Sequence, residues 1–197
     1  MNTTQLIAFV TFVAVGTGSP GPNNTLLLAS GMTFGVRRTV PHVLGTTLGM
    51  ALLVGLAVAG AGAVMAAIPG LRVILRLVAS AYLLYLAARL ARGVALDPTA
   101  VQEPFSVPRA TAFQFINPKA WVFALALATG FAPDSRAGDV LALIVLALIV
   151  TITAACWAAG GATLRRVLEG RRARRITGVV LGLLLVSSVV LLWVGPT

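Results

Sequence analysis

Charged and titratable residues are scarce in this sequence of 197 residues. Only 10% of the residues are charged, five are acidic, and the chain has one histidine, one cysteine and one lysine. A soluble domain of this size and composition would have too few polar residues to cover its surface. A hydrophobic share of 58% is instead typical of a chain that crosses a membrane repeatedly. The sequence therefore predicts an all-α polytopic membrane protein.

The rarity of reactive side chains excludes several function classes. Because Cys156 is the single cysteine, an intrachain disulfide and a thiolate metal site are both excluded. A metal or organic-cation pump is expected to carry a carboxylate inside the membrane. The five acidic residues lie only in connections or at segment ends: Asp97, Glu103, Asp134, Asp139 and Glu169. We therefore expect no metal site, no cofactor and no catalytic residue.

Basic residues give the chain a net charge of +10, but their placement does not suit nucleic acid. They cluster in short connections and are not interleaved with aromatic residues, as a nucleic-acid groove would require. Successive connections alternate between the two sides of the membrane, and their arginine content differs. In membrane proteins generally, the cytoplasmic connections are the ones richer in lysine and arginine. Eleven arginines fall on one side: Arg37, Arg38, Arg89, Arg92, Arg109, Arg165, Arg166, Arg171, Arg172, Arg174 and Arg175. We expect these connections in the cytoplasm and both termini outside.

Six apolar segments have the length needed to cross a bilayer core of roughly 30 Å. They cover approximately residues 5–31 (interrupted), 40–67, 71–90, 109–131, 139–162 and 175–195. The polar, proline-containing connection Gly93–Val107 divides them into two groups of three. We predict one transmembrane domain, residues 1–197, with pseudo-repeats at about 1–92 and 109–197. Because each half has three crossings, the halves would be inverted relative to one another.

Glycines at four-residue spacing mark close helix packing in lipid. Gly45 and Gly49 show this spacing in the second segment, and Gly178 and Gly182 show it in the sixth. The sequence leaves open whether such stripes pack helices within one chain or between the copies of a homo-oligomer.

The first apolar segment contains the run Ser19-Pro20-Gly21-Pro22-Asn23-Asn24. Two prolines and a glycine remove backbone donors and clash with the preceding turn, so an ordinary helix cannot continue through them. The asparagine side chains can bond freed backbone groups or a ligand. Such a polar break is tolerated at membrane depth where it faces protein or a wet cavity.

A second break occurs in the fourth segment, at Gln114-Phe115-Ile116-Asn117-Pro118-Lys119. Pro20 and Pro118 each interrupt the first segment of their half, and matched interruptions point to a midplane binding site in secondary transporters. If the helix begins near Ser106, Lys119 lies roughly 18 Å along it, near the bilayer middle. An ammonium there favours a functional role over a surface lysine. In an unbroken helix, however, Lys119 would point away from Gln114.

The two breaks suggest a two-sided site. Asn117 before Pro118 resembles a helix N-cap followed by the first helical residue, and Pro22 with the residues before it can do the same. The free amides and positive dipole ends of two half-helices would favour an anionic group, such as an amino-acid carboxylate. The alternative is a pair of proline kinks without a ligand. The predicted substrate-binding residues are Pro20, Gly21, Pro22, Asn23, Asn24, Gln114, Asn117, Pro118 and Lys119.

Proton coupling has few candidate carriers in this sequence. Lys119 and His42 are the two, and His42 could instead be an interfacial histidine because it lies one turn into the second segment. Neither assignment follows from spacing alone.

The chain resembles the LysE/RhtB family of bacterial amino-acid exporters. The fragments that carry the resemblance are Pro20–Asn24, Gly35–Arg38 with the glycine-rich run from Gly45, Ala81–Leu86 and Phe113–Trp121. Cys156-Trp157-Ala158 and the arginines after it are similar to the branch that exports cysteine and O-acetylserine. The resemblance implies amino-acid export from the cytoplasm across the bacterial inner membrane, driven by the proton gradient, without a nucleotide or metal cofactor.

The sequence thus favours a secondary transporter that exports small amino acids or related metabolites by alternating access. The expected partners are the amino-acid substrate and the lipid bilayer. The alternatives are an intramembrane enzyme, for which the spans lack a base paired with a nucleophile, and a non-transporting assembly subunit, which would not need matched polar breaks.

Overall fold

The computed structural model describes residues 2–61, 69–92, 103–131, 136–167 and 171–194. Regular structure in these ranges is entirely helical. Among the described residues, three helical stretches are long and apolar enough to cross a membrane: Pro22–Gly60, Val73–Ala91 and Gly138–Arg165. The prediction of an all-helical membrane protein is confirmed at this level. Residues 62–67 of the second predicted segment, and most of the predicted dividing connection Gly93–Val107, lie outside the described residues.

The first helix stops where the proline-containing run begins. Helix α1 spans Thr3–Gly18, and Asn2 and Gln5 form a capping box at its start, with two hydrogen bonds of 2.8 Å. Helix α2 spans Pro22–Leu56, with Gly21 at its N-cap and Pro22 as the first helical residue. Because proline has no amide hydrogen and a fixed φ, it suits the first position of a helix.

Helix α2 consists of two antiparallel arms, residues 22–34 and 36–56, joined at Gly35. Gly35 has φ 78° and ψ 170°, a backbone conformation that favours glycine. Hydrogen bonds between the arms pair Ser30 with His42 and Asn23 with Thr46. The chain therefore reverses direction at the predicted connection between the first two segments. A short π-helix, η1 (Ala57–Ala61), follows the second arm.

Helices α5 (Val107–Ile116) and α6 (Pro118–Gly130) meet at the second proline motif. Helix α5 lies against the second arm of α2, where Gly45 and Gly49 leave room for it. A Cβ atom at Gly45 would lie 2.5 Å from the carbonyl oxygen of Val107, and one at Gly49 would lie 2.7 Å from the Gln114 side chain. These two predicted packing glycines therefore place Gln114 beside α2.

Helix α7 (Arg136–Val167) packs along both arms of α2. Gly31 of α2 lies directly on the backbone of Ala158, and Gly161 of α7 lies on the backbone of Leu28. Glycines at both contact points let the two backbones approach closely, as helices in lipid commonly do. Helix α7 is thereby held against the first arm of α2.

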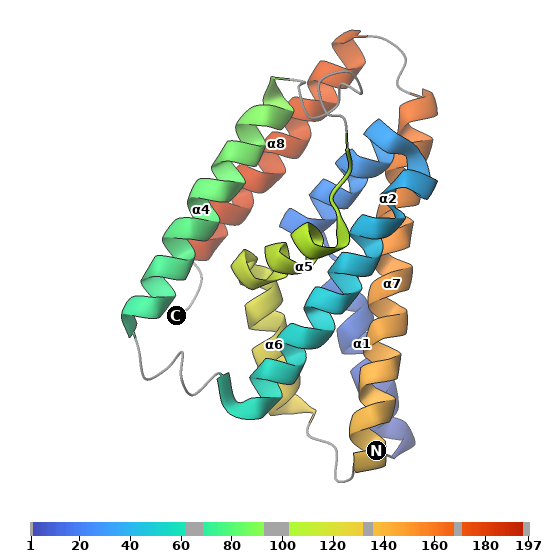
Figure 1. Ribbon diagram of the computed structural model, residues 1–197, viewed down its shortest axis with the longest axis vertical. Coiled ribbons are helices and arrows are strands. Elements are labelled where there is room, and N and C mark those ends of the chain that lie inside the picture. The colour runs from blue at the N-terminus through green and yellow to red at the C-terminus, as the bar shows by residue number, and fades with distance from the viewer. Residues whose placement is uncertain (1, 62–68, 93–102, 132–135, 168–170, 195–197) are drawn as a thin grey trace.

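Helices α4 (Pro69–Ala91) and α8 (Arg171–Val194) form a pair on one side of the molecule (Figure 1). The predicted packing glycine Gly182 lies close to Ala87, and the Trp193 indole donates a hydrogen bond to Ser80. The pair contacts the first arm of α2 through a buried apolar cluster: Leu26, Ala29, Met32, Leu83, Leu86, Ala87, Leu90, Phe113, Leu181 and Leu185.

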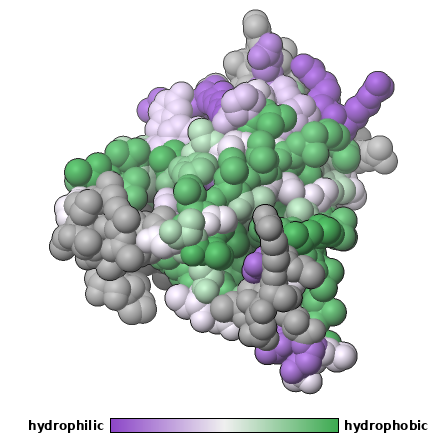
Figure 2. Space-filling view, turned by 60° about the horizontal axis from the view of Figure 1, so that its bottom comes forward, coloured by the Kyte–Doolittle hydropathy of each residue, from purple (hydrophilic) through white to green (hydrophobic). Residues whose placement is uncertain are grey.

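The outer surface of the helices is hydrophobic. Leu44, Leu48 and Leu52, spaced one turn apart on α2, are each about half exposed. Hydrophobic side chains cover the middle of the face in Figure 2, and hydrophilic ones gather toward its two ends. This distribution suits a protein surrounded by lipid and flanked by water.

Candidate functional site

The end of α1 leaves backbone carbonyls without helical partners, and side chains from three other helices bond them. Asn24 of α2 donates its amide to the carbonyls of Thr17 (2.7 Å) and Ser19 (2.9 Å). The Trp157 indole of α7 donates to the carbonyl of Gly18 at 3.1 Å. An unpaired carbonyl is costly where water is absent. The first break is therefore a bonded feature of the tertiary structure, held from outside its own helix.

Lys119 completes this bonding from the opposite break. Its ammonium donates to the carbonyl of Ser19 at 2.7 Å, to the hydroxyl of Ser19 at 2.8 Å and to the carbonyl of Pro20 at 3.2 Å. The C-terminal end of a helix carries partial negative charge, which suits a cation. Gly21 makes room for the lysine, since a Cβ atom there would lie 2.8 Å from its Cδ.

The second break has a similar architecture but fewer bonds. Helix α5 ends at Ile116, and Asn117 is the N-cap of α6 with φ −85° and ψ 108°. The Asn117 side chain does not cap α6. Its amide nitrogen donates to Gln114 at 3.3 Å, and its buried side-chain oxygen has no hydrogen-bond partner within the described part of the chain. An orphan acceptor of this kind is available to a ligand or a water.

A buried hydrogen-bond network joins the two breaks. Gln114 is fully buried and donates to the side-chain oxygen of Asn23 at 2.8 Å, and Thr46 donates to the same oxygen at 3.2 Å. The network therefore connects the start of α2, its second arm and the end of α5. The break at Pro118 is what allows Lys119, Gln114 and Asn117 to face one region, as the sequence analysis required.

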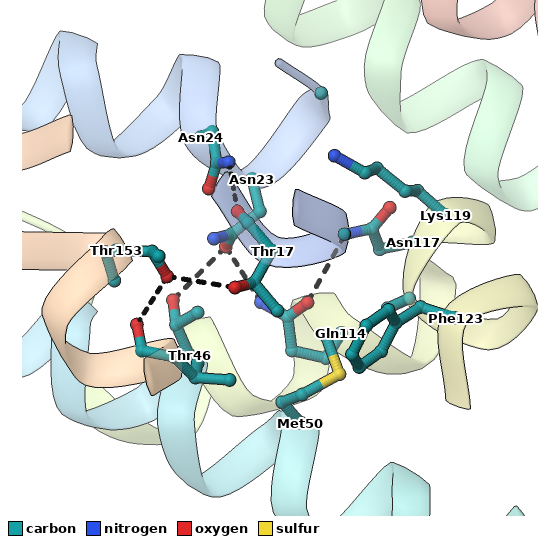
Figure 3. Close-up of a pocket in the computed structure, with 15 residues that line it drawn as sticks. Thr17, Asn23, Asn24, Thr46, Met50, Gln114, Asn117, Lys119, Phe123 and Thr153 are labelled. Carbon is teal, nitrogen blue, oxygen red and sulfur yellow. Dashed lines mark hydrogen bonds between the residues drawn. The ribbon is translucent and has the colours of Figure 1, made fainter. Parts of the chain in front are cut away.

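A central cavity of about 40 Å³ lies between the breaks (Figure 3). Its walls come from five helices and from the N-cap residues Gly21 and Asn117. The lining residues are Gly16, Thr17, Gly21, Asn23, Asn24, Thr46, Met50, Gln114, Asn117, Lys119, Ala120, Phe123, Val150, Thr153 and Ala154. Since one water molecule needs about 10–15 Å³ of such space, the cavity has room for a few water molecules. An amino acid would fit only after the surrounding helices move.

The polar groups of the cavity complement an amino acid. Lys119 is the one charged residue of its lining, and no carboxylate is among the lining residues that the structure describes. The first-turn amides of α2 and α6 lie beside it, because both helices start here. The Asn117 oxygen and the threonine hydroxyls supply acceptors for an ammonium group. One wall is apolar, formed by Met50, Phe123, Val150 and Ala154.

Six of the nine predicted binding residues line the cavity, and three do not. The six are Gly21, Asn23, Asn24, Gln114, Asn117 and Lys119. Pro20 is exposed, whereas Pro22 and Pro118 each serve as the first residue of a helix. The side chains of Asn24 and Lys119 are already bonded to α1, so the first break uses them to satisfy backbone groups in this conformation.

Sequence reasoning missed the contribution of α7 and the threonines. Thr153 of α7 donates to the Thr17 hydroxyl at 3.2 Å, and both line the cavity with Thr46 (Figure 3). The available signal was the occurrence of hydroxyl residues within apolar helices. That signal is weak, because a threonine can bond the carbonyl of its own preceding turn, as Thr153 does with Ile149.

His42 lies outside the central cavity and is fully buried between the arms of α2. Its Nδ1 lies 3.0 Å from the Ser30 hydroxyl, and its ring stacks on Phe105 with centroids 4.7 Å apart. Nε2 has no hydrogen-bond partner among the described residues. This histidine is therefore buried in the interior of the protein, away from the central cavity.

The chain matches proteins of known family over almost its whole length. A family profile described as LysE type translocator matches residues 14–195. The "Cysteine/O-acetylserine efflux protein" of Salmonella choleraesuis (strain SC-B67) is 34% identical over 194 residues, which cover 96% of this chain and 98% of that protein. The protein of the same name from Escherichia coli (strain K12) is 33% identical with the same coverage. No solved structure matches the chain.

Proposed function

Because the chain belongs to the LysE type translocator family, we propose that it is a secondary transporter that exports small amino acids or related metabolites from the cytoplasm. The family and the names of the relatives indicate a membrane transporter of amino acids, not an enzyme. The observation that carries the proposal is the central cavity, where one cation, two helix starts and an orphan amide oxygen converge.

The proposed substrates are cysteine and O-acetylserine, the two named for the relatives. An amino-acid carboxylate would bind Lys119 and the first-turn amides, and its ammonium would bind the Asn117 oxygen. The short side chain would lie against Met50 and Phe123, which offer a small apolar wall with a polarizable thioether. The size of this wall favours substrates with few carbon atoms.

Six crossings in two inverted halves are the proposed membrane arrangement. The first crossing would combine α1 with the first arm of α2, and the fourth would combine α5 with α6, so that helices 1 and 4 are the broken ones. Binding sites between such broken helices are a recurring design of secondary transporters. Alternating access would open the central cavity first to one side and then to the other, consistent with its small volume here.

We place the arginine-rich connections in the cytoplasm and both termini outside, in the inner membrane of a bacterium. Export would be driven by the proton gradient, with Lys119 and His42 as the candidate carriers. Lys119 would release α1 when the substrate carboxylate takes its ammonium, which couples substrate binding to the helix that must move.

Export from cells that overproduce the chain tests this function. Cells loaded with cysteine or O-acetylserine are expected to release more of either compound than cells with an empty vector. Lys119→Ala and Asn117→Ala each remove a polar partner of the substrate from the cavity wall, so we expect export to fall about tenfold or more.

A matched control is Val122→Ala, which truncates a side chain that is 70% exposed on the outer face of the same helix α6. It is expected to export as the wild type does. Unchanged export by well-expressed Lys119→Ala and Asn117→Ala variants would show that the substrate binds elsewhere.

A further inference from the structure

A second cavity, of about 70 Å³, lies between α4 and the first arm of α2 and is bounded by the segment before α5. It shares no lining residue with the central cavity. Most of its wall is apolar, formed by Leu26, Ala29, Phe34, Leu86, Leu90, Pro104 and Phe105. Four polar residues complete it: Ser30, Arg89, Glu103 and Arg109.

Both signs of charge are present in this cavity. The Arg89 guanidinium lies 5.9 Å from the centroid of the Tyr85 ring, and the Arg109 guanidinium lies 4.6 Å from that of Phe105. Within the part of the chain that the structure describes, neither arginine forms an ion pair with Glu103 or any other carboxylate. Each guanidinium carries a planar fork of donors that matches a carboxylate. Arg89 Nη1 donates to the Tyr85 hydroxyl at 3.5 Å, and each guanidinium has further N–H donors that bond no carboxylate among the described residues.

Two hydrogen bonds between the arms of α2 involve residues of this cavity and of the central one. Ser30 lines the second cavity and bonds His42 across the arms of α2. His42 lies one turn from Thr46, which lines the central cavity and bonds Asn23. Phe105, also in the wall of the second cavity, stacks on the His42 ring with an interplanar angle of 15°. The Phe105–His42 stack therefore borders the second cavity, and His42 shares a face of α2 with Thr46 of the central cavity.

We propose that the second cavity is an access site that binds the amino acid as a zwitterion before it reaches the central cavity. Arg89 and Arg109 bind the carboxylate, and Glu103 binds the ammonium group. The Phe105–His42 stack closes the passage inward in this conformation. This inference rests on the proposed export function and adds a second binding site to it. An anionic lipid headgroup also suits two arginines, but the Glu103 carboxylate in the same cavity repels it.

Kinetics in everted membrane vesicles test the access site, since these vesicles expose the cytoplasmic face to the medium. Uptake of labelled cysteine, kept reduced, is measured against its external concentration for Arg89→Gln, Arg109→Gln and Glu103→Gln. We expect the half-saturating concentration to rise about fivefold in each variant, as for the loss of one partly exposed ion pair. The maximal rate is expected to stay within about twofold, because the central site is intact.

Two further variants control this experiment. Arg37→Gln removes an exposed arginine from the turn of α2, outside both cavities, and is expected to leave the half-saturating concentration unchanged. Arg89→Lys keeps the charge, so its half-saturating concentration is expected to lie between those of the wild type and Arg89→Gln. Glu103→Gln changes an exposed residue outside the helices, so it tests the site even if an arginine variant fails to fold.

Three results would overturn the access site. In the first, Arg89→Gln, Arg109→Gln and Glu103→Gln all have the same half-saturating concentration as the Arg37→Gln control. The second is a loss confined to the maximal rate. The third, which assigns the cavity to lipid, is an effect that appears in reconstituted vesicles with phosphatidylglycerol and is absent in vesicles of phosphatidylcholine alone. If vesicles with the wild-type protein transported no amino acid, the proposed export function would itself be refuted, and the access site with it.

Discussion

Replacing Lys119 with methionine removes the hydrogen bonds that its ammonium donates across the first break, while a similar apolar stem remains. The three acceptors are the carbonyls of Ser19 and Pro20 and the hydroxyl of Ser19, at 2.7, 3.2 and 2.8 Å. A hydrogen bond to a charged donor contributes about 1.5–3 kcal/mol when buried. The ammonium is only partly buried, so solvent reduces the total for the three bonds to about 2 kcal/mol.

Thermal unfolding in detergent, followed by tryptophan fluorescence, measures this loss. For a chain of this length, 1 kcal/mol corresponds to a change in Tm of about 2–4 °C, so Lys119→Met is expected to lower Tm by about 4–8 °C. Arg37→Met, which removes an exposed cation at the turn of α2, is expected to leave Tm within about 2 °C, as exposed charges contribute little.

A double-mutant cycle with Ser19→Ala isolates one of the bonds. In the wild type, Ser19→Ala removes the bond from Lys119 and the bond that the hydroxyl donates to the Gly16 carbonyl at 3.1 Å. In the Lys119→Met background only the second bond is lost. We therefore expect a coupling energy of about 1 kcal/mol. Strictly additive Tm shifts, or a Lys119→Met protein as stable as the wild type, would refute the argument that Lys119 holds the break.

Four further substitutions, one of them a control, test other parts of the structure by the same unfolding measurement. Trp157→Phe keeps a ring but leaves the Gly18 carbonyl unbonded, so we expect a loss of about 1–3 kcal/mol; an unchanged Tm would mean that water replaces the indole. Gly31→Ala forces a methyl group against the α7 backbone, so we expect it to lower the free energy of unfolding by about 1–3 kcal/mol. The control Gly55→Ala adds a methyl group in open space and is expected to stabilise the protein by up to about 1 kcal/mol. Equal effects of the two substitutions would contradict the close contact at Gly31. Gln114→Leu removes a donor to a buried oxygen and is expected to destabilise by about 1–3 kcal/mol and to lower export; full stability and export would remove the network from the mechanism.

The two helix breaks could be located from the sequence because their cause is local. Proline lacks an amide hydrogen and fixes its own φ, so Pro22 and Pro118 mark helix starts in any fold. The turn at Gly35 likewise lies where the sequence predicts a connection, since the chain there becomes polar at Arg37 and Arg38. The packing role of Gly45 and Gly49 also follows from spacing, and both glycines contact α5.

The partners of the breaks could not be found in this way. Lys119 bonds a residue 100 positions earlier, and Trp157 bonds one 139 positions earlier. Helical angles alone place Lys119 away from Gln114, and only the bend at Asn117 turns it toward α1. The second cavity could not be predicted either, because the whole dividing connection Gly93–Val107 separates Arg89 from Arg109 in the sequence.

The sequence by itself determined that this chain is helical and apolar, that its helices stop at two proline motifs, and that a lone lysine lies beside one of them. These properties depend on backbone geometry and transfer free energy, which act within a few residues. Only the tertiary structure decided that Lys119 bonds the other proline motif and that threonines and α7 line the central cavity. It also decided that two arginines and a glutamate line the second cavity. Those contacts depend on how the helices pack, and packing is set by close approaches such as that of Gly31 to Ala158, whose partners lie far apart in the chain.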